Sequence, residues 1–261
     1  VKQIAGKAVA ASKNKPEKMF KIITQSGKMI KCTHTHPIFI ARDTKVKAVR
    51  TDELITGNYV ATPRQLTIRN QPQELMPVGR GKTNANHIQF PEKTSYEFGQ
   101  FVGFLLAEGY SNNHESSPFF TFTNSDAENL DLFEKTSQSL FGLAPFKQDR
   151  ESCSAYWLCS VELYRFIQIN APEILFHSRE RTIPKIIQKS DTNTLKGFLQ
   201  AFIESEGHVQ GIRKGGKHQS TIEVSSASHR LITQLSYLLL RFGIVSTITE
   251  TQKMATNGAR V

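Results

Sequence analysis

The sequence predicts an α+β protein in which a small, all-β module precedes a larger domain built from two similar halves. Three observations lead to this prediction. The first third of the chain alternates apolar and polar residues around turn signals, as short antiparallel strands do. The rest mixes strand-like runs with longer helical patterns. Within that part, one helical motif occurs twice.

The β-rich module covers about residues 1–66. Residues 19–40, MFKIITQSGKMIKCTHTHPIFI, alternate around a Ser-Gly turn, and residues 47–66, KAVRTDELITGNYVATPRQL, continue the pattern with a turn at 56–58. Residues 67–93 are polar, contain three prolines and show no period. We therefore predict a linker or basic extension there.

The repeated motif lies in residues 94–261. It reads FVGFLLAEG up to residue 109 and LQAFIESEG up to residue 207, so the copies align at an offset of 98 positions. Small residues recur every fourth position in both, which lets two helix backbones approach closely. We therefore expect the two motif helices to pack on each other. The aligned pairs are Gly99 with Gly197, Gly103 with Ala201, Ala107 with Ser205, Glu108 with Glu206, and Gly109 with Gly207.

The order of elements also repeats. In the first copy we expect a helix that starts at Thr94, capped by the T-S-Y-E pattern, and stops at Gly109. Strands at 119–123 and 153–161 and helices at 126–141 and 162–169 follow. The second copy predicts a helix to Glu206, a strand at 221–225, a helix at 227–242 and a strand at 244–250. The copies span about 94–180 and 181–261, and the second lacks a strand end and a closing helix, so we expect the chain to be a fragment.

The two motif glutamates are the strongest candidates for chemistry. If the motif helices run side by side, Glu108 and Glu206 meet at their C-terminal ends, where two carboxylates repel each other and the helix dipoles. Mg²⁺, or Mn²⁺ in its place, would relieve this repulsion, with the last-turn carbonyls of Ala107 and Ser205 as further ligands. We therefore predict a metal site that activates water for phosphodiester hydrolysis.

Composition narrows the partners. The formal charge of +10 and the pI near 9.5 favour a polyanion, and nucleic acid fits better than lipid because no basic amphipathic anchor is evident. The sequence has no run of about 18 apolar residues and no signal-peptide core, so we expect a soluble, cytoplasmic protein. The three cysteines form no CxxC pair, which argues against zinc.

The motifs FVGFLLAEG and LQAFIESEG resemble those of LAGLIDADG homing endonucleases in the single-chain form with two copies. The resemblance covers about residues 94–261. It implies a pseudo-two-fold pair of αββαββα halves with saddle-shaped antiparallel sheets that straddle duplex DNA. It also implies a monomer that makes a site-specific double-strand break at a long asymmetric target, with one active carboxylate per strand. Both acids are Glu here, where Asp is commoner in the family.

The first module is similar to the N-terminal part of the Hint splicing domain of inteins. KCTHTHPIFIARD and DELITGNYVATPRQL carry this resemblance, which implies that Thr33 and His36 polarise the amide at the upstream splice junction. The chain starts at Val1 without a Cys or Ser nucleophile and has no terminal His-Asn. We therefore do not expect this chain to splice as it stands.

The functional prediction is an intein-encoded, Mg²⁺-dependent site-specific endodeoxyribonuclease. Two alternatives stay open: a cleavage-deficient, maturase-like LAGLIDADG protein that binds DNA or RNA, and a protein-splicing element with a remnant nuclease. Basic residues near strands and hairpins are the candidates for phosphate contact. They are Lys147, which is also the candidate basic residue near the metals, Arg150, Arg213, Lys214 and Lys217.

Overall fold

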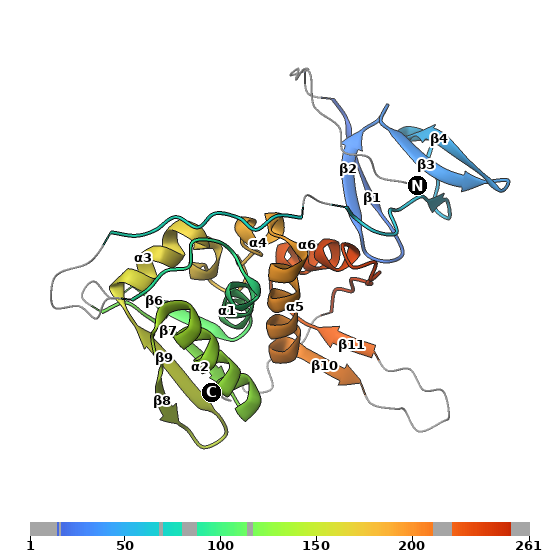
Figure 1. The fold of residues 1–261 in the computed structure, drawn as a ribbon. Coiled ribbons are helices and arrows are strands. Elements are labelled where there is room, and N and C mark those ends of the chain that lie inside the picture. The colour runs from blue at the N-terminus through green and yellow to red at the C-terminus, as the bar shows by residue number, and fades with distance from the viewer. Residues whose placement is uncertain are drawn as a thin grey trace. The chain divides into compact units, whose positions relative to one another are not determined.

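The computed structural model describes residues 15, 17–67, 70–79, 88–113, 117–210 and 221–251. It is an α+β structure in which every described strand pair is antiparallel (Figure 1). The chain divides into two compact units, Val1–Thr67 with Ser236–Val261, and Ile68–Leu235. Within the described ranges, no helix is both long and apolar enough to cross a membrane.

In the first unit, the described residues up to Val60 form five strands and one short 3₁₀ helix. Its strands form a β1–β2 hairpin and a three-stranded sheet in the order β4-β3-β5. The predicted Ser-Gly turn is confirmed, because Gly27 has a φ of 76° in the link between β1 and β2. The elements are β1 (Met19–Ile23), β2 (Met29–Thr33), β3 (Pro37–Arg42), β4 (Lys45–Arg50), the 3₁₀ helix η1 (Thr51–Glu53) and β5 (Tyr59–Val60).

The strand predicted at 244–250 is wrong, since these residues have no regular secondary structure. Ile248 instead donates its backbone N–H to the carbonyl of Ser26, 2.9 Å away, and lies against the β1–β2 turn. A Cβ atom on Gly27 would collide with the carbonyl of Ile248. On the repeat alignment, the strand that should pair with 244–250 falls within residues 252–261, which lie outside the described residues.

The second unit contains the motif helices. It has a four-stranded sheet in the order β6-β7-β9-β8 and a separate β10–β11 hairpin (Figure 1). Helix, hairpin and helix follow each other twice, as α1-β6-β7-α2 and α5-β10-β11-α6. The elements are α1 (Tyr96–Ala107), β6 (Gly109–Asn112), β7 (Phe119–Asn124), α2 (Ala127–Phe141), β8 (Phe146–Asp149), β9 (Ser154–Cys159), α3 (Val161–Asn170), η2 (Pro172–Leu175), α4 (Lys185–Lys189), α5 (Thr192–Glu206), β10 (Gly207–Gln210), β11 (Thr221–Val224) and α6 (His229–Leu240), whose last residues belong to the first unit.

Aromatic packing joins α1 and α2 to one face of the four-stranded sheet. Phe104 of α1 and Phe133 of α2 both contact Phe122 of β7, with ring centroids 5.0 and 4.9 Å away. Phe122 and its neighbour on this face, Phe120, are fully buried. The opposite face carries the alternate residues, and its Tyr110 is exposed. Helices therefore cover only one face of this sheet.

The first motif helix starts and stops at residues other than those predicted. Its N-cap is Ser95, whose hydroxyl accepts the N–H of Phe98, and not Thr94. Thr94 is buried, and its hydroxyl is used elsewhere because it accepts from the N–H of Gln73 (2.9 Å) and the hydroxyl of Ser190 (3.0 Å). The helix ends at Ala107, with Glu108 as its C-cap, and Gly109 opens β6.

The described part of 67–93, where the sequence predicts a linker or basic extension, packs against the second unit. Leu75 is buried and donates its N–H to the carbonyl of Glu92 at 2.8 Å. The side chain of Asn170 bonds to both the N–H (2.8 Å) and the carbonyl (2.9 Å) of Met76. Phe90 stacks on Phe166 with centroids 4.9 Å apart. These residues therefore pack against α3 within the second unit.

Candidate functional site

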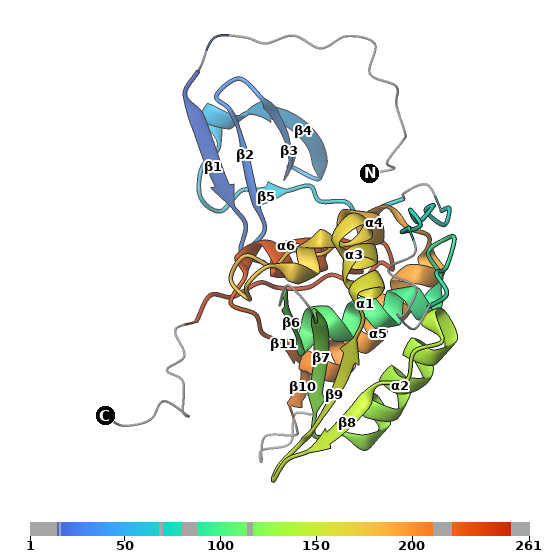
Figure 2. The ribbon, with the colours of Figure 1, turned by 90° about the vertical axis from the view of Figure 1, so that its left-hand side faces the viewer.

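The two motif helices pack backbone to backbone, as the sequence predicts. Figure 2 shows α1 and α5 against each other. A Cβ atom on Gly99 would collide with the carbonyl of Thr194, and one on Gly103 would lie 2.7 Å from the carbonyl of Phe198. Gly197 is as tightly placed against Tyr96. Because later residues of α1 meet later residues of α5, the helices run in the same direction.

This arrangement brings the two glutamates to the same end of the helix pair. Glu108 caps α1 and Glu206 is the last residue of α5. Burial raises the pKa of Glu108 above its usual range. The pKa of Glu206 is raised to about 7, mainly by burial and further by the negative charge of Glu108. The charge of Glu108 is therefore close enough to oppose the ionisation of Glu206, as one carboxylate does to another in a shared site.

Arg181 is a third charged group at this end, and the sequence gives no periodic or motif signal for it. It precedes α4 and is buried. Its Nη1 donates to the carbonyl of Leu106 (3.1 Å), and its Nη2 donates to that of Gly109 (2.5 Å). Its charge lowers the pKa of Glu206 and so opposes the effect of Glu108. The site thus combines the exposed Glu108 and the partly buried Glu206 with one buried guanidinium.

The donor set fits a hard divalent cation. Two carboxylates and last-turn carbonyls, those of Ala107 and Ser205 among them, are oxygen ligands of the kind that Mg²⁺ takes together with water. The hydroxyl oxygen of Ser205, the residue before Glu206, is buried and has no hydrogen-bond partner among the described residues. The described part of the chain contains no group of three or more His, Cys, Asp or Glu side chains that could hold a metal ion. A metal here would depend on the two glutamates and on backbone oxygens.

Two of the five predicted phosphate-contacting residues, Lys147 and Arg150, lie in the described part of the chain, at the β8–β9 hairpin. Lys147 is exposed on β8 and pairs with Asp149 at 2.9 Å, which raises the pKa of Lys147. It stands opposite Tyr156 in the sheet register, and Tyr156 stands opposite Phe122, so Lys147 lies on the helix-covered face. Arg150 is exposed in the β8–β9 turn. Three further candidates, Arg213, Lys214 and Lys217, lie outside the described residues.

One face of the four-stranded sheet carries a row of aromatic residues. Tyr110 begins a cross-strand row that runs through Thr121 and Trp157 to Phe146. We call this row, which is partly exposed through Tyr110 and Phe146, the open face. No lysine or arginine belongs to the row.

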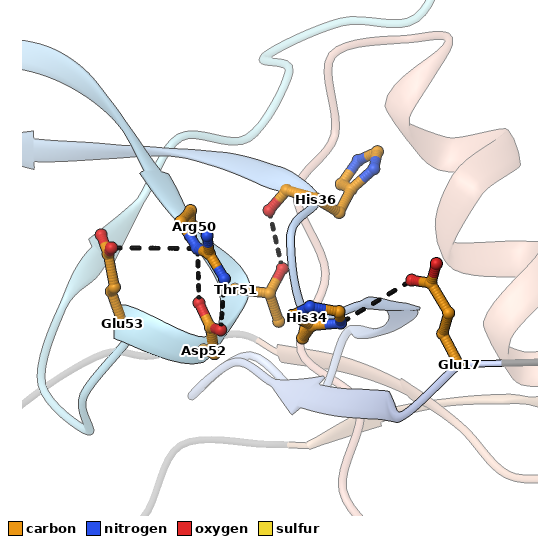
Figure 3. Close-up of polar contacts among 7 residues, drawn as sticks. All are labelled: Glu17, His34, His36, Arg50, Thr51, Asp52 and Glu53. Carbon is orange, nitrogen blue, oxygen red and sulfur yellow. Dashed lines mark hydrogen bonds and ion pairs between the residues drawn. The ribbon is translucent and has the colours of Figure 1, made fainter.

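In the first unit, the structure joins Thr33 and His36 in one turn. His36 donates its N–H to the carbonyl of Thr33 at 3.2 Å, and its own carbonyl accepts from the N–H (3.0 Å) and the hydroxyl (2.9 Å) of Thr51. Figure 3 shows the imidazoles of His34 and His36 pointing in different directions, with His34 toward Glu17, 3.7 Å away. The buried Thr51 therefore fixes the backbone of this turn and leaves the His36 ring exposed.

Known proteins resemble the chain over most of its length. It is 27% identical to a replication factor C small subunit of Methanocaldococcus jannaschii, over 91% of this chain and 11% of that protein. It is 25% identical to the RNA polymerase subunit Rpo1C of the same organism, over 90% and 28%. It is 23% identical to one of the A-type ATP synthase subunits of Pyrococcus abyssi, over 89% and 22%. The chain therefore spans less than a third of each of these relatives.

A family model describes the second motif and the residues after it. Residues 193–260 match the model of the LAGLIDADG-like domain. The matched range starts within α5 and includes Glu206, the β10–β11 hairpin and α6. The similarity to this family is thus shown for residues 193–260.

Proposed function

We propose that the chain is a homing endonuclease that makes a site-specific double-strand break in DNA with the help of Mg²⁺. The observation that carries this proposal is the placement of Glu108 and Glu206 at the shared end of the closely packed helices α1 and α5. Each glutamate belongs to its own helix and hairpin, so each can serve one DNA strand. The match of residues 193–260 to the LAGLIDADG-like domain supports this class of nuclease.

In this proposal, the chain's own groups hold the metal and the substrate in place. Glu108 and Glu206 supply the anionic ligands, and the carbonyls of Ala107 and Ser205 add neutral oxygens. Bound Mg²⁺ would activate a water and stabilise the leaving oxygen of the phosphodiester. Glu206 must lose its proton to act as a ligand, and its pKa of about 7 places that step near neutral pH.

We further propose that the nuclease is carried within an intein. The names of the three relatives describe proteins with unrelated functions. The segment that matches this chain is a minor part of each. A segment shared among proteins so different is typical of an element inserted into its hosts. The turn that joins Thr33 and His36 supports a Hint-like splicing role for the first unit. In a full-length precursor, His36→Ala should block splicing and leave DNA cleavage intact. Splicing at the parental rate would contradict that role.

The nuclease proposal is tested by removing each charge separately. The target is first selected from a pool of randomised DNA and placed in a supercoiled plasmid. Glu108→Gln and Glu206→Gln keep the size of the side chain and remove its charge, so Mg²⁺-dependent cleavage should fall by orders of magnitude while DNA affinity is kept. Glu204→Gln is the matched control, because Glu204 is exposed in the same last turn of α5.

Cleavage is followed strand by strand, with Mg²⁺ and with EDTA. If either glutamine variant cuts both strands at the parental rate, that glutamate is not a metal ligand of the reaction. If the parental protein binds a selected site but does not cut it with Mg²⁺ or Mn²⁺, the chain is a binding protein of the maturase-like kind.

A further inference from the structure

We propose that Arg181 is a positioning residue of the two-carboxylate site, because it holds the backbone on both sides of Glu108 and so sets where that carboxylate meets a metal ion. This inference rests on the proposed function and adds to it a residue outside both motifs.

The guanidinium of Arg181 is bound on three sides by backbone carbonyls. Nη1 and Nη2 hold Leu106 and Gly109, which flank Glu108, and Nε donates to the carbonyl of Phe176 at 3.2 Å. A planar guanidinium can make these bonds at fixed angles at the same time, which an ammonium cannot. The two carbonyls that it holds lie where α1 ends and β6 begins. Arg181 therefore fixes the bend on which Glu108 stands.

The rest of the fold holds Arg181 itself in place. Its carbonyl accepts from the buried hydroxyl of Ser228 at 2.6 Å, and that hydroxyl also accepts the N–H of Leu231 in the first turn of α6. The arginine thus connects the end of the first motif helix with the start of α6. Tertiary contacts from a distant part of the chain determine the position of Glu108.

The charge of Arg181 has a second effect. A buried guanidinium carries a large desolvation cost, so carbonyls alone are a weak reason to place it there. A cation near a helix C-terminus offsets the negative end of the dipole, and here two helices end together. Arg181 also attracts Glu206. It therefore favours the ionised form of Glu206 beside Glu108.

The test replaces Arg181 with methionine, which keeps an unbranched apolar side chain and removes the guanidinium. Arg179→Met is the matched control, because Arg179 is exposed two positions earlier and loses the same charge. In Arg181→Met we expect faster amide hydrogen exchange over residues 106–110. We also expect the Mg²⁺ concentration for half-maximal cleavage to rise by about 10- to 100-fold, the range for groups that orient metal ligands. DNA affinity measured with Ca²⁺ should not change.

Arg181→Lys separates the two effects and provides the test if the methionine variant does not fold. It keeps the charge, but its three N–H groups stand on one nitrogen and cannot reach these three carbonyls as the separate nitrogens of arginine do, so it should restore part of the Mg²⁺ response and leave exchange over 106–110 fast. Unchanged exchange and an unchanged Mg²⁺ midpoint in a folded variant would overturn the proposal. If the parental protein cuts no DNA, the proposed function fails, and the exchange rates alone decide whether Arg181 holds this bend.

Discussion

At the residue scale, the ionisation of Glu206 links the site to stability. Its pKa is about 7 in the folded protein, against an ordinary value of 4.5. Between these values the folded state binds more protons than the unfolded state, so the free energy of unfolding falls as pH rises through this window. Below it, the carboxyl is neutral in both states, and this penalty is absent.

This predicts a pH dependence that Glu206→Gln removes. Urea unfolding of the metal-free protein should show that the variant gains stability relative to the parent as pH rises from about 4.5 to about 7. Glu204→Gln should follow the parent at every pH. Mg²⁺ should stabilise the parent more at pH values above 7 than below, because it binds the ionised carboxylate. If the free energies of unfolding of the parent and of Glu206→Gln changed with pH in parallel, this carboxyl would not be buried in the folded protein.

Arg181 shows at the same scale why a site residue can escape sequence analysis. It lies outside both copies of the repeated motif, and its bonds reach back to Leu106 and Gly109. Nothing local distinguishes it from its neighbour Arg179, which is exposed. Burial alone makes one of them part of the site.

At the element scale, the packing of α1 on α5 determines whether a site exists. Both helices present glycines where a side chain would meet the partner's backbone. Gly99 and Gly197 lie near the N-terminal ends and Gly103 in the middle, so the contact runs along the helices. The two glutamates lie at the same end of the helix pair because the helices run in the same direction.

We therefore expect Gly103→Leu to disrupt the protein as a whole. A Cβ at this position already lies 2.7 Å from the carbonyl of Phe198 and 2.9 Å from the Cβ of Ala201. Overpacking of this kind lowers the free energy of unfolding by about 1–3 kcal/mol or more. Gly79→Leu is the control, because a Cβ there has no atom within 4 Å. Equal thermal stability of both variants would mean that the helices do not pack through this face.

The open face is a second feature at the element scale, because it arises from the register of the four-stranded sheet. The sheet register places the aromatic row on one face and Lys147 on the opposite, helix-covered face. Arginine or lysine in the major groove is the usual reader of guanine, and the open face provides neither. Phosphate contacts are then left to hairpins and loops at the margin of the sheet.

At the scale of the whole molecule, net charge bears on the proposed association with DNA. The chain carries a formal charge of +10. Each phosphate contact releases counterions from DNA, so the logarithm of the binding constant should fall steeply and linearly with the logarithm of the salt concentration. A slope near zero would contradict a nuclease that holds its target through phosphates.

Two basic residues of the predicted hairpin give the finer test. Arg213→Ala and Lys217→Ala should each reduce the salt slope by about one if they contact phosphate. Lys135→Ala is the control, since Lys135 lies in α2 and pairs with Asp131 at 2.6 Å. A change in the preferred bases at constant slope would assign either residue to base reading.

The sequence by itself determined the features that depend on short spacings. The small residues at every fourth position predicted that α1 packs on α5, and the alternation around Gly27 predicted the β1–β2 hairpin. Only the tertiary structure decided the others. Thr94 is not the N-cap because distant residues use its hydroxyl, and 244–250 forms no strand because it lies against the β1–β2 turn. The high pKa of Glu206 and the part played by Arg181 arise from burial and from groups far apart in the chain, and local periodicity carries no information about either.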